Sequence, residues 1–326
     1  MRVPIEAVDY HTAGEPFRIV TGGVPPLEGL TILDKRRFAA ERLDEVRRLL
    51  VFEPRGHADM YGGFVTESEE EGADLGVVFF HNAGYSTACG HGTIALVTWA
   101  LESGRLGSQA PETRVVVDVP SGRVETVARV ENGRVAAVRF RNVPAFVVDR
   151  GLDVAGVRAD VAFGGAFYAS VEAPFGVESG NVPAFIELGR RVKRELEAAT
   201  EYVHPLEPEL RDVYGVIFWE EGSAGRSLVQ RNVTVFADGE VDRSPCGSGT
   251  SARLALLDSS GALQRGNELV HRSVVGTEFR AWVVGEAPVA GFPAVVTEVE
   301  GSAYYTGRHE FALDPADPLG SGFLLR

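Results

Sequence analysis

Apolar positions recur along the chain with two different periods, and each period predicts a different kind of element. In four segments they recur every three or four residues, which is typical of amphipathic helices. These segments are residues 34–50, 89–103, 183–200 and 246–259. The first carries its apolar stripe on Ala39, Leu43, Val46 and Leu50. We therefore expect helices at these positions, separated by long stretches of another kind.

Between the helices, apolar and polar residues mostly alternate, which predicts strands. Residues 114–148 alternate in this way, and Asn132-Gly133 between two alternating runs predicts a tight hairpin turn. From residue 269 to 311 short β-branched runs recur between glycines. Few helices among many antiparallel-type strands predict an α+β fold. Because no glycine-rich phosphate-binding loop follows a strand, a nucleotide-binding fold is not expected.

One short motif occurs twice, about half a chain apart. Residues 89–95 read Cys-Gly-His-Gly-Thr-Ile-Ala and residues 246–252 read Cys-Gly-Ser-Gly-Thr-Ser-Ala, a shift of 246 − 89 = 157 positions. Each copy is a cysteine followed by a glycine-rich helix start and an apolar helix body. We therefore expect two related domains, residues 1–150 and 151–302, each with a cysteine at the N-terminus of its central helix.

Composition and charge narrow the class of partner. Of the 326 residues, 44% are hydrophobic and 24% are charged, as in ordinary globular proteins. The formal net charge of 32 − 46 = −14 disfavours binding to phosphate backbones and anionic membranes. No apolar run approaches the roughly 18 residues of a membrane span, and the N-terminus lacks the apolar core of a signal peptide. We expect a cytoplasmic protein that acts on a small molecule, without nucleic-acid or membrane partners.

Lysine is scarce, and this bears on cofactors. The only lysines are Lys35 and Lys193, and each lies in a charge-rich helical stretch. A lysine that forms a Schiff base needs a desolvated pocket that lowers its pKa. Neither lysine is placed for that role, so pyridoxal chemistry is not expected. The sequence predicts no cofactor.

The two cysteines, Cys89 and Cys246, are the candidate catalytic groups. A lone cysteine is most often a small buried hydrophobic residue, but these two occupy equivalent positions in a repeated motif. At a helix N-terminus, the amides and the macrodipole stabilise a thiolate and also bind a carboxylate. Two such helix starts would put one sulfur on each side of an α-carbon. A two-base racemase needs that arrangement, in which one thiolate removes the proton and the opposite thiol delivers one.

Other interpretations of the cysteines are weaker. A structural disulfide is disfavoured in a cytoplasmic protein. A zinc site with Cys89 and His91 needs two further ligands, and no spacing in the sequence supplies them. A papain-like cysteine–histidine nucleophile is not excluded by spacing, but it leaves the second cysteine without a role. From the residues alone, His91 is equally a capping or packing histidine, and the less favoured interpretation of Asp242 is a partner of the helix dipole.

Four segments resemble the proline racemase family, which includes hydroxyproline 2-epimerases and trans-3-hydroxy-L-proline dehydratases. They are residues 9–16 (Asp-Tyr-His-Thr-Ala-Gly-Glu-Pro), 55–62 (Arg-Gly-His-Ala-Asp-Met-Tyr-Gly), 89–94 (Cys-Gly-His-Gly-Thr-Ile) and 242–250 (Asp-Arg-Ser-Pro-Cys-Gly-Ser-Gly-Thr). The resemblance extends from about residue 6 to residue 325, which is essentially the whole chain.

The resemblance implies a fold and a set of site residues. The implied fold is the two-domain α+β fold of diaminopimelate epimerase, in which each domain is a curved, mostly antiparallel sheet around a central helix. Residues 303–326 would return to the first domain, and homodimers are common in the family. Cys89 and Cys246 would be the acid/base thiols of the site. The substrate-binding groups would be the amides of Gly90, His91, Gly247 and Ser248 for the carboxylate, Asp242 for the ring ammonium, and Phe236 as a pocket wall.

Within the family, the second cysteine separates two reactions. Dehydratases are similar to this chain in residues 81–87 and 235–242, but they carry threonine at the position of Cys246. Elimination needs a base on one face, whereas racemisation needs proton exchange on both faces. We therefore expect a proline racemase or hydroxyproline 2-epimerase, with trans-3-hydroxy-L-proline dehydratase as the alternative. A catalytically silent amino-acid-binding protein is the remote alternative. The sequence leaves open whether the imino acid is proline, 3-hydroxyproline or 4-hydroxyproline.

Overall fold

The computed structural model describes residues 4–222 and 227–325. The internal contacts divide the chain into two compact units, Met1–Val138 with Ser302–Arg326, and Arg139–Gly301. Residue 150, where the sequence suggests a boundary, lies inside strand β9 (Ala145–Val154). The strands that pair with β9 at this point belong to the second unit, so the division falls earlier in the chain.

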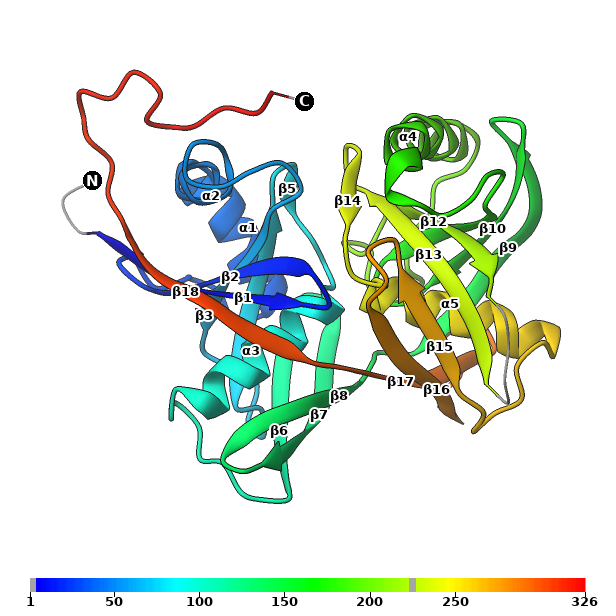
Figure 1. The fold of residues 1–326 in the computed structure, drawn as a ribbon, viewed down its shortest axis with the longest axis horizontal. Helices are drawn as coiled ribbons and strands as arrows, with labels where there is room; N and C mark the ends of the chain where they lie inside the picture. Colours follow the sequence, from blue (N-terminus) through cyan, green and yellow to red (C-terminus); the bar gives the residue numbers. More distant parts are fainter. Residues whose placement is uncertain (1–3, 223–226, 326) are drawn as a thin grey trace. The chain divides into compact units, whose positions relative to one another are not determined.

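The first unit is a mixed sheet with a buried helix. Its elements are β1 (Ile5–Thr12), β2 (Glu15–Gly22), α1 (Ile32–Arg42), α2 (Asp44–Val51), β3 (Tyr61–Thr66), β4 (Leu75–His81), β5 (Gly84–Tyr85), α3 (Gly90–Glu102), β6 (Glu112–Val119), β7 (Gly122–Glu131), β8 (Arg134–Arg141, which crosses the division) and β18 (Ala303–Phe311). Pairing gives the order β18-β1-β2-β3-β4-β6-β7, antiparallel except for β2–β3 and β4–β6. Strand β18, from the far end of the chain, lies beside β1 (Figure 1).

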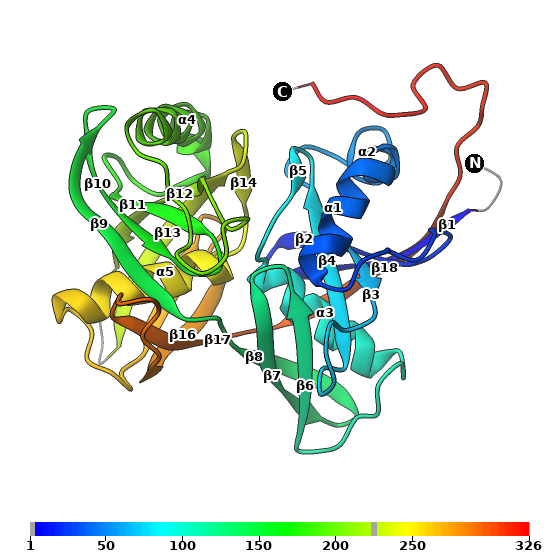
Figure 2. The same ribbon diagram turned by 180° about the vertical axis from the view of Figure 1, so that it is seen from behind.

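The second unit is a closed ring of strands around a helix. Its elements are β9, β10 (Val157–Phe163), β11 (Phe167–Glu172), the short 3₁₀ helix η1 (Ser179–Asn181), α4 (Val182–Ala199), β12 (Val213–Glu221), β13 (Leu228–Phe236), β14 (Glu240–Asp242), α5 (Gly247–Ser260), β15 (Leu269–Ser273), β16 (Glu278–Glu286) and β17 (Ala294–Gly301). The order is β9-β10-β11-β12-β13-β15-β16-β17, and β17 pairs back with β9. Helix α5 lies within this ring, and α4 packs on β12 and β13 (Figure 2).

The two units follow the same strand plan. In the first, β2-β3-β4-β6-β7 pair as parallel, antiparallel, parallel and antiparallel. In the second, β11-β12-β13-β15-β16 pair in the same sequence of directions. A short strand, β5 or β14, precedes the central helix in each unit. The repeated cysteine motif therefore marks a duplicated architecture.

The central helices are buried on all sides, which sets them apart from amphipathic surface helices. Helix α3 is buried from Gly90 to Leu101, and α5 from Gly247 to Leu257. Even the one cation of α5, Arg253, is buried: it donates to Gln230 and Ser170 and lies 3.7 Å from the centre of the Trp219 ring. The start of each helix is consequently fixed by its packing against the surrounding sheet.

The helix expected at residues 34–50 is two helices. Its predicted stripe is buried as expected, but the chain leaves helical geometry at Leu43, where φ is −121° and ψ is 14°. Helix α2 then begins with Asp44 and Glu45 in its first turn, where acidic side chains favour a helix start. The Arg47 guanidinium pairs with Asp44 and donates to the carbonyl of His81, which fixes α2 against the end of β4.

The predicted turn at Asn132-Gly133 is confirmed. Both residues have positive φ, 52° and 77°, as the turn that suits twisted antiparallel strands requires.

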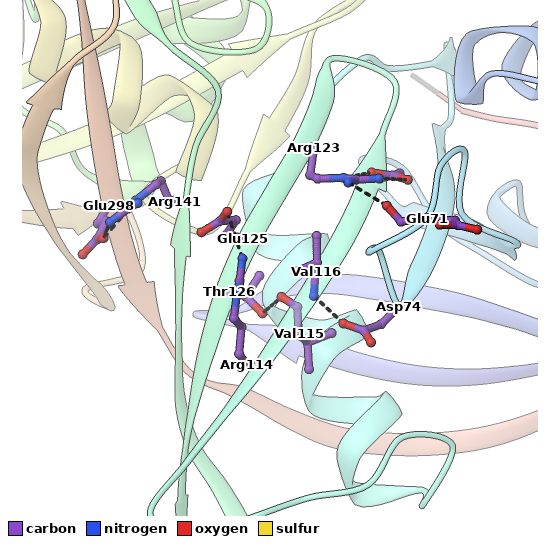
Figure 3. A network of polar contacts seen from close by, with 11 residues as sticks. Glu71, Asp74, Arg114, Val115, Val116, Arg123, Glu125, Thr126, Arg141 and Glu298 are labelled. Carbon is purple, nitrogen blue, oxygen red and sulfur yellow. Dashed lines mark hydrogen bonds and ion pairs between the residues drawn. The ribbon is translucent and has the colours of Figure 1, made fainter.

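Polar contacts hold the neighbouring strands (Figure 3). The Asp74 carboxylate accepts from the Val116 N–H at 2.8 Å, and the Thr126 hydroxyl donates to the Val115 carbonyl at 2.7 Å. Within the described ranges 4–222 and 227–325, no helix combines the length and the apolar character of a membrane span.

Candidate active site

The first candidate thiol is the N-cap of α3. Cys89 has extended geometry (φ −154°, ψ 95°), is 6% exposed, and accepts a hydrogen bond from the Gly92 N–H to its sulfur at 3.3 Å. Gly92 is required here, because a Cβ would lie 2.7 Å from the sulfur and 2.5 Å from the Phe17 ring. The glycine-rich motif thus lets the sulfur approach the helix amides closely.

His91 lies beside this sulfur in an apolar setting. Both of its ring nitrogens are 3.5 Å from the Cys89 sulfur, and its ring meets those of Phe17 and Tyr61 edge-on at 5.8 and 5.0 Å. Burial lowers the pKa of His91 to about 3, so the imidazole is neutral. The Thr12 hydroxyl donates to its carbonyl at 2.9 Å. His91 is therefore both a packing residue and a neutral neighbour of the thiol.

The second candidate thiol is the N-cap of α5, and its main chain differs. Cys246 has φ 63° and ψ 99°, in the left-handed region that few non-glycine residues adopt. Its N–H donates to the Ser244 hydroxyl at 3.1 Å. Gly249 matches Gly92: a Cβ there would lie 2.9 Å from the sulfur and 2.9 Å from Ile217. In both units the third helix residue must be glycine for the same steric reason.

The surroundings of Cys246 keep its thiol protonated. Burial, and then the charge of Asp242, raise the pKa of Cys246 well above its usual range. The Gly249 N–H and the hydroxyls of Tyr168 and Thr234 offset part of that rise in the pKa. The thiol donates to the Tyr168 hydroxyl across a long contact of 3.8 Å.

Asp242 ends β14, four residues before the cysteine. Its carboxylate accepts from the Ser244 N–H at 2.8 Å. Burial raises the pKa of Asp242 to about 6, although hydrogen bonds from Ser244 act in the opposite direction. A carboxylate this poorly solvated gains from pairing with a cation.

Ser248 and Phe236 connect through aromatic side chains that sequence reasoning missed. The Tyr168 hydroxyl lies 2.7 Å from the Ser248 hydroxyl, Tyr168 meets Tyr214 edge-on, and Tyr214 stacks on Phe236 at 5.6 Å. Tyr168 and Tyr214 lie on β11 and β12, which pair in parallel. No local pattern marks these two tyrosines, because strand pairing alone brings them to the α5 start.

The predicted site residues therefore form one group in each unit. The first unit holds Cys89, Gly90 and His91 at the start of α3. The second holds Phe236, Asp242, Cys246, Gly247 and Ser248 at the ends of β13 and β14 and the start of α5. The first amides of each helix lack acceptors within the helix, as at any helix N-terminus. Each group can thus present a thiol and amide donors to an anion.

Two other segments that carried the resemblance mainly build the first unit. The Asp9 carboxylate pairs with Arg18 at 2.7 Å and with His309 at 3.1 Å, which joins β1 to β2 and β18. Arg55 donates to the Leu49 carbonyl at 3.1 Å and to the carbonyl of Gly320 at 2.6 Å. In the described part of the chain, no three His, Cys, Asp or Glu side chains are grouped as metal ligands.

Comparisons with known proteins give matches over nearly the whole chain. The profile of a family described as proline racemase matches residues 7–324. The chain is 47% identical to a 3-hydroxyproline 2-epimerase of Burkholderia multivorans, over 99% of this chain and 98% of that protein. It is also 47% identical to a trans-3-hydroxy-L-proline dehydratase of Burkholderia cenocepacia, over 99% of this chain and 98% of that protein.

Solved structures match the fold. The crystal structure of a hydroxyproline epimerase from Agrobacterium vitis, with bound trans-4-hydroxy-L-proline, matches with a TM-score of 0.92 and 33% identity, covering 99% of this chain and 96% of that one. A phenazine biosynthesis protein of the PhzF family from Bacillus anthracis shares only the fold, with a TM-score of 0.59 and 13% identity. The predicted two-domain α+β fold is confirmed.

Proposed function

The chain belongs to the proline racemase family, as its motifs predicted, and from that premise we propose that it is a cofactor-independent 2-epimerase of 3-hydroxyproline. Cys89 and Cys246 are its two acid/base thiols. The observation that carries the proposal is their equivalence. Each is the only cysteine of its unit, caps the central helix, and has its sulfur against the third helix residue, which must be glycine.

In this proposal the helix amides and Asp242 bind the substrate. The amides of Gly90 and His91 and those of Gly247 and Ser248 hold the carboxylate, which gains negative charge as the α-proton leaves. Helix N-termini stabilise that developing charge in the transition state. Asp242 accepts the ring ammonium, and Phe236, which stacks on Tyr214, lines the pocket.

The two thiols take different roles in the free enzyme. Cys246 is the thiol that keeps its proton, because burial and Asp242 raise its pKa. Cys89, whose sulfur accepts a hydrogen bond from the Gly92 N–H, is in this proposal the thiolate that starts as base. Substrate ammonium neutralises Asp242, so the Cys246 thiol becomes easier to deprotonate as it delivers its proton to the opposite face.

The choice of 3-hydroxyproline rests on the names of similar proteins. Several relatives at 42–47% identity are named for 3-hydroxyproline, whether as epimerase or as dehydratase. Identity does not separate the two reactions, since one relative of each kind is 47% identical. Cys246 favours the epimerase. In trans-3-hydroxy-L-proline the α-hydrogen and the hydroxyl lie on the same ring face, so one thiol there suffices for elimination, whereas inversion needs a donor on the other face.

The test is a product analysis in deuterated water. The protein is incubated separately with trans-3-hydroxy-L-proline, trans-4-hydroxy-L-proline and L-proline. The products are separated on a chiral column, and their masses are measured by mass spectrometry. The proposal expects the 2-epimer of trans-3-hydroxy-L-proline with one deuterium at the α-carbon. A borohydride-reducible pyrroline as the main product, without epimer from any substrate, would make the protein a dehydratase. If no product forms and no deuterium is taken up, the protein is a catalytically silent binding protein.

A further inference from the structure

We propose that Thr250 and His271 are positioning residues for Cys246: they fix the peptide group between Pro245 and Cys246 and so hold the thiol against the start of α5. This inference rests on the proposed role of Cys246 as an acid/base group. Neither side chain belongs to the groups that bind substrate in that proposal. Both are completely buried.

The main chain at Cys246 needs external support. With φ at 63°, this residue has a conformation that is unfavourable for any side chain with a Cβ, and such conformations persist only where the surroundings enforce them. Its counterpart Cys89 has φ at −154°, an ordinary extended value. The main chain at the start of α5 therefore requires support from surrounding groups that the start of α3 does not.

Hydrogen bonds hold the peptide group on both sides. The Pro245 carbonyl accepts from the Thr250 hydroxyl at 3.1 Å and from the Asn232 side-chain amide at 3.2 Å. On the other side, the Cys246 N–H donates to the Ser244 hydroxyl at 3.1 Å. All three donors and acceptors belong to buried side chains. The plane of this peptide group is consequently fixed, and with it the direction in which the Cys246 side chain leaves the main chain.

His271 gives the Thr250 hydroxyl its direction. The imidazole Nδ1 lies 2.8 Å from the Thr250 oxygen, while Nε2 has no hydrogen-bond partner. Burial, and then the charge of Arg253, lower the pKa of His271 to about 3, so the ring is neutral and carries a single N–H. A buried N–H without a partner is rarer in proteins than an unused acceptor, which puts the hydrogen on Nδ1. His271 then donates to Thr250, and the only hydroxyl proton of Thr250 is left for the Pro245 carbonyl.

The equivalent threonine in the first unit is used differently. Thr93 stands where Thr250 stands in the repeated motif, but its hydroxyl donates to the Cys89 carbonyl at 2.9 Å, within its own helix. That bond is a common feature of helical threonines. The contact from Thr250 to the residue before the cysteine is thus specific to the helix start with the left-handed cysteine.

The first experiment compares valine and serine at position 250 in the full-length protein. Thr250→Val preserves shape and removes the hydroxyl, and we expect kcat for 2-epimerisation to fall about 10- to 100-fold with KM within about twofold, since a displaced catalytic group loses rate rather than binding. Thr250→Ser retains the hydroxyl and restores most of kcat. The matched control is Thr98→Val, which removes an equally buried helical hydroxyl that donates to Ile94 at 2.8 Å and is expected to leave kcat unchanged.

The second experiment reads the position of the thiol without turnover. Iodoacetamide labelling at fixed pH, followed by peptide mass spectrometry, gives the alkylation rates of Cys246 and Cys89 in the same molecules. In Thr250→Val the rate at Cys246 is expected to fall at least about threefold relative to Cys89, because the sulfur moves away from the stabilising Gly249 amide. His271→Leu is expected to act in the same direction, and His271→Asn, which keeps an N–H near the Nδ1 position, to act less.

The two readouts separate the possible failures. If Thr250→Val matches Thr98→Val both in kcat and in the ratio of Cys246 to Cys89 labelling, the positioning role is wrong. If the wild-type protein performs no 2-epimerisation, the proposed function is wrong, and the labelling ratio still decides whether Thr250 and His271 position the cysteine. Equal loss of labelling at both cysteines, with a lowered melting temperature, would also overturn the inference, since it would indicate general destabilisation.

Discussion

The starts of α3 and α5 share one main-chain plan but have different neighbouring side chains. Both begin with a cysteine, both continue with glycines, and in both a Cβ on the third helix residue would collide with the sulfur. Four residues before the cysteine, however, the first unit has Tyr85 and the second has Asp242. Two residues after it, the first has a neutral imidazole, His91, and the second has the hydroxyl of Ser248.

This difference shows how a duplicated scaffold can yield two unlike groups. The shared glycines set the distance between sulfur and amide, which favours a thiolate at either helix start. The residues that diverged set the local charge. The charge of Asp242 raises the pKa of Cys246, whereas the sulfur of Cys89 lies beside the Gly92 N–H and the neutral His91 ring. In the proposed function, one backbone plan thereby supplies a base and an acid.

The largest effect is expected when either thiol is replaced. Cys89→Ser and Cys246→Ser should each lower 2-epimerisation by about 10²- to 10⁴-fold, because a hydroxyl is far too weak an acid to take part in the proton transfer. The retained thiol should still exchange the α-proton of one 2-epimer with deuterated water, and the two variants should prefer opposite 2-epimers. Near-native turnover in either variant would show that the two helix starts are not the two halves of one mechanism.

The shared glycines come next. Gly92→Ala and Gly249→Ala should both displace the sulfur and reduce kcat about 10- to 100-fold. The loss in free energy of unfolding, on the order of 1–3 kcal/mol for overpacking, should be larger for Gly92→Ala, since its Cβ would also meet the buried Phe17 ring at 2.5 Å. Gly107→Ala, where a Cβ meets nothing within 4 Å, is the control. Equal activity in all three variants would contradict the close approach of sulfur and helix.

The unlike neighbours predict the pH dependence of the reaction. Asp242 has a pKa of about 6, so it should become protonated as the pH falls and no longer pair with the substrate ammonium. We therefore expect kcat/KM to drop about tenfold per pH unit below pH 6. His91 should not contribute to that limb, because its pKa is about 3. His91→Gln is therefore expected to keep the limb in place. If the acid limb disappears in this variant, the titrating group lies at the start of α3 and not at the start of α5.

The last prediction concerns stability, and its sign distinguishes two buried carboxylates. Burial raises the pKa of Asp242 from 3.8 to about 6, so the folded protein binds this proton more tightly than the unfolded chain does. Stability from this group is complete below pH 3.8 and is lost as the pH rises to about 6. Asp242→Asn should remove the loss and raise the free energy of unfolding at pH 8 by on the order of 2–3 kcal/mol, while activity falls.

Asp118 provides the contrast for this measurement. Burial acts to raise its pKa, but the hydrogen bonds and charge of Arg123 prevail and lower it. The contribution of Asp118 is therefore present above its unfolded pKa and is lost as the pH falls. Asp118→Asn should lower the melting temperature at pH 8, and Asp242→Asn should raise it by several degrees. Melting curves that shift in the same direction for both variants would contradict the different environments described for the two carboxylates.

Much of the architecture was predictable because it depends on local pattern. The glycine-rich helix starts at Cys89 and Cys246, and the turn at Asn132-Gly133, need particular residues at particular positions, and those residues are visible in the sequence. The break at Leu43 was missed, because the apolar stripe continues across it without change. Asp44 and Glu45, which mark the start of a second helix, were the available signal.

The groups around Cys246 were only partly predictable, for a different reason. Asp242 lies close to the cysteine in the sequence, and the motif includes it. Tyr168, Thr234 and His271 lie on β11, β13 and β15, and only the pairing of strands distant in sequence brings them to the start of α5. No periodicity distinguishes these side chains from ordinary strand residues. The charge on the thiol depends on such neighbours, so the chemistry of a site is harder to predict than its main chain.

The pairing of β1 with β18 has a consequence for how the protein is made. Strand β1 ends at Thr12 and its neighbour β18 begins at Ala303, so 303 − 12 = 291 positions separate them. At about 5–20 residues per second of synthesis, β18 follows β1 from the ribosome after roughly 15–60 s. The second unit is continuous from Arg139 to Gly301, and its last strand, β17, leaves the ribosome just before β18. The first unit must wait with one edge of β1 open, and an unpaired strand edge is where a growing chain is most exposed to pairing with a wrong partner.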